Sequence, residues 1–136
     1  MTAFVLDTSA VLTLLWQETG ADRVAEVLAA GDHVISAVNL AELFTKAAEA
    51  AMPVKDLRSL IDTLQLKTHP FDAAQAFAVG QLRPATRHLG LSLGDRACLA
   101  LAQQLGAVAL TADRPWRDLD LGIAVECIRH NDHNDH

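Results

Sequence analysis

Apolar residues along this chain form two alternating kinds of pattern. Short apolar runs at residues 4–6, 33–36 and 107–110 are typical of strands that are buried on both faces of a sheet. Residues 67–70, which end in a proline, predict a short edge strand, and residues 123–128 predict a last strand. The pattern therefore predicts five strands, all of them short.

Between these runs, apolar residues recur at helical spacing. The hydroxyl of Thr8 or Ser9 is expected to cap the first helix, and Asp72 and Gln75 have the form of a capping box. Gly106 is expected to end the last long helix. The predicted helices cover residues 10–16, 21–30, 37–51, 54–66, 73–82 and 92–105.

Strands that alternate with helices, with short connections and no hairpin pattern, indicate a parallel sheet between two layers of helices. With 136 residues the chain is long enough for one domain with a substantial core. We expect this single domain to span residues 1–129. Residues 130–136 contain Asn-Asp-His twice and are expected to form a disordered polar tail.

The composition is that expected of a globular protein from a reducing compartment. Half of the residues are apolar (51%), yet no apolar run approaches the roughly 18 residues of a membrane span. No secretory signal is recognisable, and Cys98 and Cys127 lie in apolar patterns that favour buried free thiols. We therefore expect a cytoplasmic protein that does not contact a membrane.

The net charge of −6 disfavours binding of nucleic acid by bulk charge alone. However, a cluster of carboxylates that serves a divalent metal would also make the metal-free chain acidic. The charge therefore leaves a nucleic-acid substrate open.

Four acidic residues stand where the predicted sheet would bring them together. Asp7 follows the first strand directly, and Asp113 lies three residues past the apolar run at residues 107–110. Glu42 lies in the helix after the second strand, and Asp95 lies in the first turn of the last long helix. The ends of parallel strands and the starts of the following helices meet at one edge of such a sheet. All four carboxylates can therefore converge on one site.

A divalent cation would explain this group of acids. Hard cations such as Mg²⁺ and Mn²⁺ prefer oxygen ligands. Several carboxylates packed together without a cation repel one another and take up protons, so a metal is the ordinary way to keep them ionised. Asp7 is the hardest of the four to explain otherwise, because a carboxylate directly after a buried apolar run is unusual without a partner.

The other three acids also have simpler explanations. Glu42 precedes Lys46 by four residues, the favourable order for a surface ion pair, and Asn39, Glu42, Lys46 and Glu49 form a polar stripe that a solvated helix face would explain. Asp95 can serve the dipole of its helix within the start signature Ser92-Leu93-Gly94-Asp95. Asp113 can be a turn residue.

Further polar residues near the four acids have two interpretations each. Ser9 can bond a water on the metal or cap its helix, and Thr111 can orient Asp113 or simply end a strand. Asp118 or Asp120 could add a fifth oxygen ligand. Arginines beside an acidic site suit a phosphodiester backbone, although surface solubility explains them as well. The arginines in such positions are Arg83, Arg87, Arg96 and Arg114.

Four segments around the acids carry a resemblance to a known family. The segments are 5–10 (VLDTSA), 35–42 (ISAVNLAE), 91–97 (LSLGDRA) and 110–114 (LTADR). In this order and at these intervals they resemble the PIN domain, and more specifically the VapC-type toxins of bacterial toxin–antitoxin pairs. The resemblance extends from residue 4 to about residue 128, and the family's acidic residues fall on Asp7, Glu42, Asp95 and Asp113.

The resemblance implies a three-layer α/β/α fold with a parallel five-stranded sheet and a Mg²⁺- or Mn²⁺-dependent endoribonuclease. Asp7 and Asp95 would be the principal metal ligands, with Glu42 and Asp113 completing the pocket directly or through water. From their positions beside the acids, and not from the resemblance, we expect Ser9 and Thr111 to support these ligands and the arginines above to bind RNA. The resemblance also implies a homodimer and a cognate antitoxin that occupies the active-site groove, with the helices between residues 54 and 82 forming part of that groove.

Three other protein classes are compatible with a strand that ends in aspartate. A haloacid-dehalogenase-type phosphatase expects a second aspartate where this chain has Ser9, and a late lysine, whereas no lysine follows Lys67. A phospho-receiver module would need an acidic pair near the first strand and a late lysine, both of which are missing. A catalytically silent PIN-like module that only binds protein stays open, although the intact set of four acids argues against it.

Overall fold

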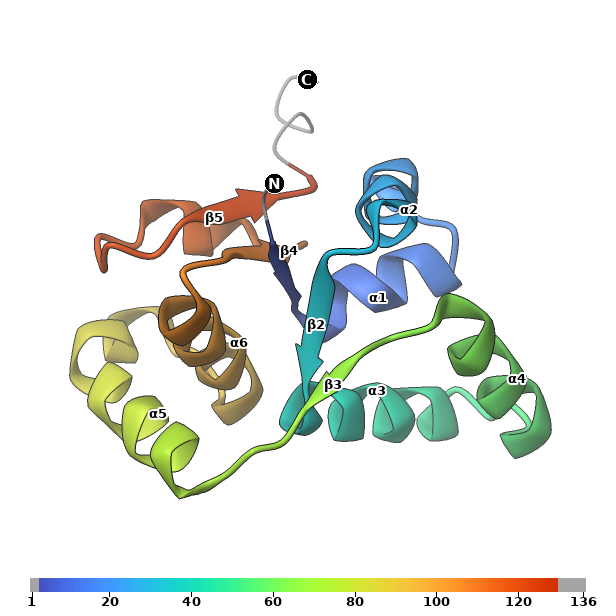
Figure 1. The fold of residues 1–136 in the computed structure, drawn as a ribbon, viewed down its shortest axis with the longest axis horizontal. Helices are drawn as coiled ribbons and strands as arrows, with labels where there is room; N and C mark the ends of the chain where they lie inside the picture. The colour runs from blue at the N-terminus through green and yellow to red at the C-terminus, as the bar shows by residue number, and fades with distance from the viewer. Residues whose placement is uncertain (1–2, 130–136) are drawn as a thin grey trace.

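A parallel sheet of five short strands forms the centre of the molecule (Figure 1). The computed structural model describes residues 3–129, except for the side chains of Arg114 and Arg117. The predicted tail at residues 130–136 and the first two residues of the predicted domain lie outside this part. The strands lie in the order β3-β2-β1-β4-β5. Their bounds are β1 Phe4–Leu6, β2 His33–Ser36, β3 Thr68–His69, β4 Val108–Thr111 and β5 Val125–Cys127.

β1 lies at the middle of the sheet and pairs with β2 on one side and β4 on the other. Phe4 is opposite His33 in β2 and opposite Val108 in β4, so the three strands end close to the same level. β3 lies at one edge with two residues, as the proline after it predicts. The five predicted strands and their parallel direction are confirmed.

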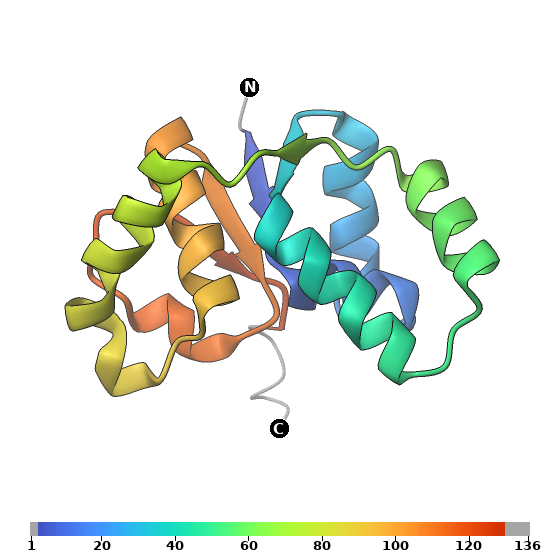
Figure 2. The same ribbon diagram turned by 90° about the horizontal axis from the view of Figure 1, so that it is seen from below.

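Helices cover both faces of the sheet, which confirms the predicted three-layer fold. Figure 2 shows α5 and α6 on one side of the sheet and α2, α3 and α4 on the other. Two short 3-10 helices, η1 Arg87–Leu89 and η2 Arg114–Asp118, connect the later elements. The helix bounds are α1 Thr8–Leu15, α2 Ala21–Ala30, α3 Ala37–Glu49, α4 Val54–Leu64, α5 Ala73–Thr86 and α6 Leu93–Leu105.

Two hydrophobic clusters hold these layers together, one on each face of the sheet. Consecutive strand residues point to opposite faces, so Val5 packs in one cluster and Leu6 in the other. The first cluster receives α5, α6 and Trp116, which is fully buried. The second receives α1, α2 and the apolar faces of α3 and α4. Two firmly packed faces leave the carboxyl edge of the sheet as the place for polar groups.

The ends of two helices differ from the prediction. Thr8 and Ser9 do not cap α1; the helix begins at Thr8, Asp7 occupies the cap position, and no side chain bonds there. Both hydroxyls instead make tertiary hydrogen bonds, described below. α5 extends to Thr86 rather than ending near residue 82, and its last turn includes Pro84. Asp72 caps α5 by accepting from the backbone of Gln75. The Gln75 side chain donates to Gln104 Oε1 instead of completing the predicted capping box.

Cys98 and Cys127 are both buried, as predicted, and Cys98 is a free thiol. Of the two tryptophans, Trp116 belongs to the core, whereas Trp16 is 42% exposed at the end of α1. None of the helices in the described part of the chain combines the length and the apolar composition of a membrane span.

Candidate active site

Asp7 lies at the end of β1, where the strand gives way to α1, and is almost fully buried (3% exposed). Its backbone N–H donates to Leu110 of β4, which fixes the end of β1 against the neighbouring strand. A carboxylate in this position is shielded from water and must find its partners inside the protein.

Two hydroxyl groups supply partners to one oxygen of this carboxylate. Ser9 Oγ donates to Asp7 Oδ2 at 2.6 Å, and Thr111 Oγ1 donates to the same oxygen at 3.1 Å. Each hydroxyl also accepts a backbone N–H, Ser9 from Ala112 at 2.9 Å and Thr111 from Asp113 at 3.0 Å. The hydroxyls therefore bind the segment after β4 to Asp7. Among the described residues, the other oxygen, Oδ1, receives only a 3.5 Å contact from Asn39, so it faces little competition for a further ligand.

Glu42 lies in the second turn of α3 and is also held by a hydroxyl. Thr8 Oγ1 donates to Glu42 Oε1 at 2.8 Å. The adjacent residue, Ser9, donates to Asp7, so two consecutive hydroxyl residues hold two different carboxylates. The sequence suggested an ion pair between Glu42 and Lys46. Among the described residues the ion pairs instead join arginines to glutamates, and none involves Lys46.

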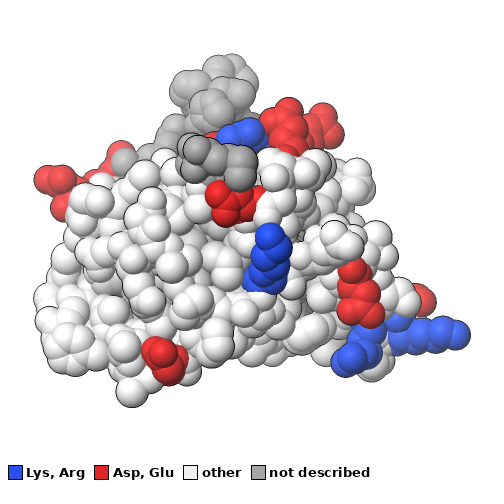
Figure 3. All heavy atoms as spheres, in the orientation of Figure 1, with Lys and Arg blue, Asp and Glu red and all other residues white. Residues whose placement is uncertain are grey.

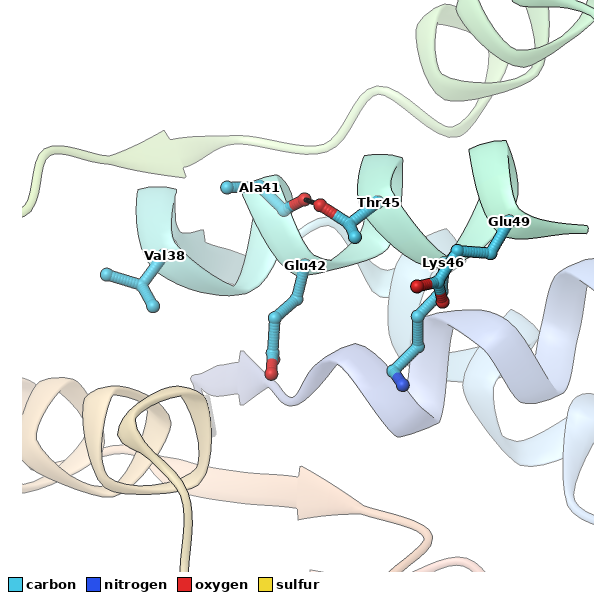
Figure 4. A pocket seen from close by; sticks show the side chains of 6 residues that line it. All are labelled: Val38, Ala41, Glu42, Thr45, Lys46 and Glu49. Atoms are coloured by element: carbon cyan, nitrogen blue, oxygen red, sulfur yellow. Dashed lines mark hydrogen bonds between the residues drawn. The ribbon is translucent and has the colours of Figure 1, made fainter.

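A shallow cleft of about 360 Å³ runs along α3 beside Glu42. Figure 4 shows that Glu42 and Lys46 extend from the same side of α3 toward α1. Both side chains therefore line one surface, with the carboxylate nearer the sheet and the ammonium group one turn further along. The other lining residues are Val38, Ala41, Thr45 and Glu49.

Asp95 belongs to the start of α6 and is held by its own helix. Ser92 Oγ accepts from the backbone of Asp95 at 3.1 Å, and Asp95 Oδ2 accepts from the backbone of Ser92 at 2.9 Å. This reciprocal pair is a capping box, so the helix-start role suggested for Asp95 is confirmed. The capping box uses one carboxylate oxygen of Asp95, Oδ2, and leaves the other oxygen available to a ligand.

The four acids influence one another through their charges. Burial raises the pKa of Asp7 from 3.8 to about 7; the hydrogen bonds from Ser9 and Thr111 oppose this rise, and the charges of Asp95 and Glu42 add to it. Burial and the charge of Asp95 likewise raise the pKa of Asp113. The structure thus brings all four predicted acids within electrostatic reach of at least one other.

This donor set fits a hydrated divalent cation in its chemistry, although the side chains do not form a closed cage. In the described part of the chain, no three His, Cys, Asp or Glu side chains are close enough together to hold an ion as they stand. Mg²⁺ keeps several of its waters and needs only one or two direct carboxylates. Asp7 has one oxygen with little hydrogen bonding, and two neighbouring carboxylates repel its charge. A bound cation would therefore offset more repulsion at Asp7 than at the other acids.

The predicted arginines lie on the α5 and α6 side of the molecule. Arg96 Nη1 donates to the carbonyl of Val79 at 3.2 Å, so this side chain braces α6 against α5. Arg83 makes a longer contact of 3.4 Å with the carbonyl of Leu91, and Arg87 is exposed. The side chain of Arg114 lies outside the described part. Figure 3 shows scattered charges and no continuous basic patch among the described side chains on the face that it displays.

Sequence reasoning missed three residues of this site. Thr8 holds Glu42, and Asn39 is fully buried rather than part of a solvated stripe. Gly94 lies directly against the Glu42 carboxylate. A signal for Asn39 was available, because residues three apart on a helix share a face and Asn39 precedes Glu42 by three. A glycine in the first turn of a helix likewise indicates a packing reason.

Comparison with known proteins agrees with this fold. A family model described as "PIN domain" matches residues 4–121. Among solved structures, "DNA bound VapBC" from Salmonella typhimurium has a TM-score of 0.72 at 24% identity and covers 94% of this chain and 99% of that chain.

A second similar structure is "VapBC2 from Rickettsia felis bound to a DNA fragment from their promoter", with a TM-score of 0.72 at 20% identity over 93% of this chain and 98% of that chain. A third is "FitAcB from Neisseria gonorrhoeae", with a TM-score of 0.67 at 23% identity over 93% and 99%. At these identities the likenesses establish the fold. A search of curated proteins found no match.

Proposed function

Because the chain belongs to the PIN domain family, we propose that it is a divalent-metal-dependent endoribonuclease and the toxin of a toxin–antitoxin pair. The substrate is RNA, and the reaction is hydrolysis of a phosphodiester bond. Asp7 and Asp95 are the principal ligands of Mg²⁺ or Mn²⁺, and Glu42 and Asp113 complete the acidic pocket.

The state of Asp7 is the observation that supports this proposal best. Its carboxylate is buried, its pKa is raised to about 7, and two further carboxylates oppose its charge. A fold that needed only a polar group at the end of β1 would be more stable with an asparagine there. A cation bound at this edge offsets the repulsion and makes the ionised aspartate favourable.

The protein's own residues prepare the site in three ways. Ser9 and Thr111 orient Asp7 through Oδ2 and leave Oδ1 toward the ligand. The capping box holds Asp95 at a defined position on α6. Lys46 lies one turn beyond Glu42 in the same cleft and can contact a phosphate of the RNA next to the one that is cleaved. The chemistry that a bound divalent ion supplies is activation of a water molecule and neutralisation of charge on the scissile phosphate.

The toxin assignment rests on the names of the similar structures, several of which are toxin–antitoxin complexes. By this similarity the partner is a small antitoxin that covers the active-site groove, with α4 and α5 contributing to that groove. We also propose that the chain forms a homodimer.

Cleavage of mixed RNA with Mg²⁺ or Mn²⁺ tests the proposal. We expect the wild-type protein to cleave RNA and to lose activity in EDTA, in Asp7→Asn and in Asp95→Asn. Activity that survives EDTA or both substitutions would contradict the metal mechanism. A folded, metal-supplied protein that cleaves no RNA but binds the antitoxin would instead indicate the catalytically silent protein-binding module.

A further inference from the structure

The carboxylate of Glu42 occupies the space in which a side chain at position 94 would lie. Gly94 is buried in the first turn of α6. A Cβ atom on it would lie 2.6 Å from Glu42 Cδ and 2.8 Å from Glu42 Oε2, and closer still to Oε1. All three of the nearest atoms belong to this one carboxylate. A side chain at position 94 and the Glu42 carboxylate in its present place therefore exclude each other sterically. Only glycine at position 94 leaves the Glu42 carboxylate in this place.

The amide of Asn39 connects the same turn of α6 to the residue that holds Glu42. Asn39 is fully buried, and its Nδ2 donates to the carbonyl of Gly94 at 3.0 Å and to Thr8 Oγ1 at 3.3 Å. The carbonyl of Gly94 is an acceptor only, which fixes the amide orientation with Nδ2 on this side. The amide therefore ties α3 to both α6 and the start of α1.

Thr8 passes this restraint on to Glu42. Its hydroxyl accepts from Asn39 and has one proton to donate, and the shorter of its two acceptor distances is the 2.8 Å to Glu42 Oε1. A charged acceptor also makes the stronger hydrogen bond. The result is a continuous chain of contacts from Gly94 through Asn39 and Thr8 to Glu42, closed by the direct contact between Glu42 and Gly94.

We propose that Gly94 and Asn39 are positioning residues that set the place of the Glu42 carboxylate in the acidic pocket. Gly94 acts by leaving space, and Asn39 acts by fixing α6 and Thr8 relative to α3. Neither residue touches the reacting atoms. The catalytic consequence rests on the proposed nuclease function, whereas the steric coupling between positions 94 and 42 does not.

A double-mutant cycle in thermal unfolding tests the coupling without any assay of activity. Gly94→Ala in the wild-type protein is expected to lower Tm slightly, because the new methyl group pushes the Glu42 carboxylate off its hydrogen bond from Thr8. In the Glu42→Ala background the same change should leave Tm unchanged or raise it, since alanine is the better helix former. Equal losses in both backgrounds would overturn the proposal.

Gly80→Ala is the matched control for this cycle. Gly80 also lies inside a helix, α5, and a Cβ on it would meet no atom within 4 Å. We expect Gly80→Ala to raise Tm slightly, with or without Glu42. A loss of Tm in Gly80→Ala of the size seen in Gly94→Ala would mean that the effect is not specific to the Glu42 contact.

RNA cleavage then tests the catalytic consequence. Gly94→Ala and Asn39→Leu are expected to lower kcat at least tenfold, with KM for RNA nearly unchanged and with a higher Mn²⁺ concentration needed for half-maximal rate. Both variants keeping wild-type kcat and Mn²⁺ dependence while folded would contradict the positioning role. If the wild-type protein cleaves no RNA, the proposed function fails. The thermal cycle still decides whether Gly94 provides the space that the Glu42 carboxylate occupies.

Discussion

The junction of β1 with α1 and the start of α6 both bring an aspartate to the same site, but by different means. Asp7 occupies the cap position of α1 without making a capping bond, and its partners come from Ser9 and from Thr111 on β4. Asp95 is more exposed and exchanges two hydrogen bonds with Ser92 within its own helix turn. One carboxylate is held by tertiary contacts in a buried place, and the other by local structure near the surface.

This difference separates function from stability in the two places. Asp95 stabilises α6 whether or not an ion is present, because a negative charge in the first turn satisfies backbone N–H groups and the helix dipole. Asp7 carries a charge that its surroundings disfavour, so its ionised form costs stability in the metal-free protein. The same residue type should therefore respond in opposite ways to the same substitution.

The largest expected effect comes from replacing each aspartate by asparagine. Both Asp7→Asn and Asp95→Asn should lower RNA cleavage on the order of 10²–10⁴-fold, because each removes a proposed metal ligand. In EDTA at pH 8 the effects on stability should differ in sign. Asp7→Asn should raise the free energy of unfolding, whereas Asp95→Asn should lower it by about 0.3–1 kcal/mol. Denaturant unfolding measures both, and a loss of stability in Asp7→Asn would remove the contrast.

The second prediction concerns pH. The pKa of Asp7 is raised to about 7, so the folded protein keeps a proton that the unfolded chain loses near pH 4. The free energy of unfolding of the metal-free protein should therefore fall as pH rises from about 4 to about 7. Titration of Asp7 should contribute a slope on the order of 1 kcal/mol per pH unit in this window, and no further loss above it.

Comparison with Asp7→Asn isolates this contribution from the other titrating groups. The difference in stability between wild type and variant should grow over the same window and then level off. Mn²⁺ should restore more stability at pH 8 than at pH 5, because it binds the ionised carboxylates. A constant difference across the window would contradict the raised pKa.

A smaller effect is expected from Ser92→Ala, which removes the acceptor that caps α6. The free energy of unfolding should fall by about 1 kcal/mol. RNA cleavage should fall far less than in Asp95→Asn, since the carboxylate itself remains. Ser92→Thr keeps a hydroxyl and is the matched control. If Ser92→Ala abolished cleavage, the position of Asp95 would depend on the capping box more than its exposed setting indicates.

The smallest effect is expected from Lys46→Ala, at the outer end of the α3 cleft. It should raise KM for RNA a few-fold, leave Tm unchanged and reduce the salt dependence of binding by the contribution of about one phosphate contact. Lys55 is an exposed lysine of α4 outside this cleft, so Lys55→Ala is the control. The same change in KM and salt dependence in both variants would show that the cleft position does not matter.

The two regions also show what sequence patterns can predict. Asp95 and its cap were predictable because Ser92 and Asp95 lie three apart in one helix start, which is local information. The strand before Asp7 and the gathering of four acids at one sheet edge followed from hydrophobic pattern and parallel topology. The partners of Asp7 and Glu42 were not predictable in this way. Thr8 and Ser9 both look like cap residues, and only tertiary structure decides that they hold two different carboxylates.

Asn39 and Gly94 illustrate the same limit. Helical spacing placed Asn39 on a polar face with Glu42, and that face proved to point partly into the protein because α6 packs against α3. The space that Gly94 leaves is visible only when both helices are in place. A pattern along one element cannot report which neighbour covers it.

The order of the strands along the chain delays assembly of this edge during translation. β1 is synthesised well before its neighbour β4 and before the Thr111 hydroxyl that reaches Asp7. Until β4 is made, β1 has a partner on one side only, and the segment that Ser9 binds does not exist. A nascent chain therefore carries Asp7, Glu42 and Asp95 without a finished pocket. For the proposed ribonuclease, this timing means that the ribosome must synthesise the chain past Thr111 before the protein can cut any RNA, including the message being read.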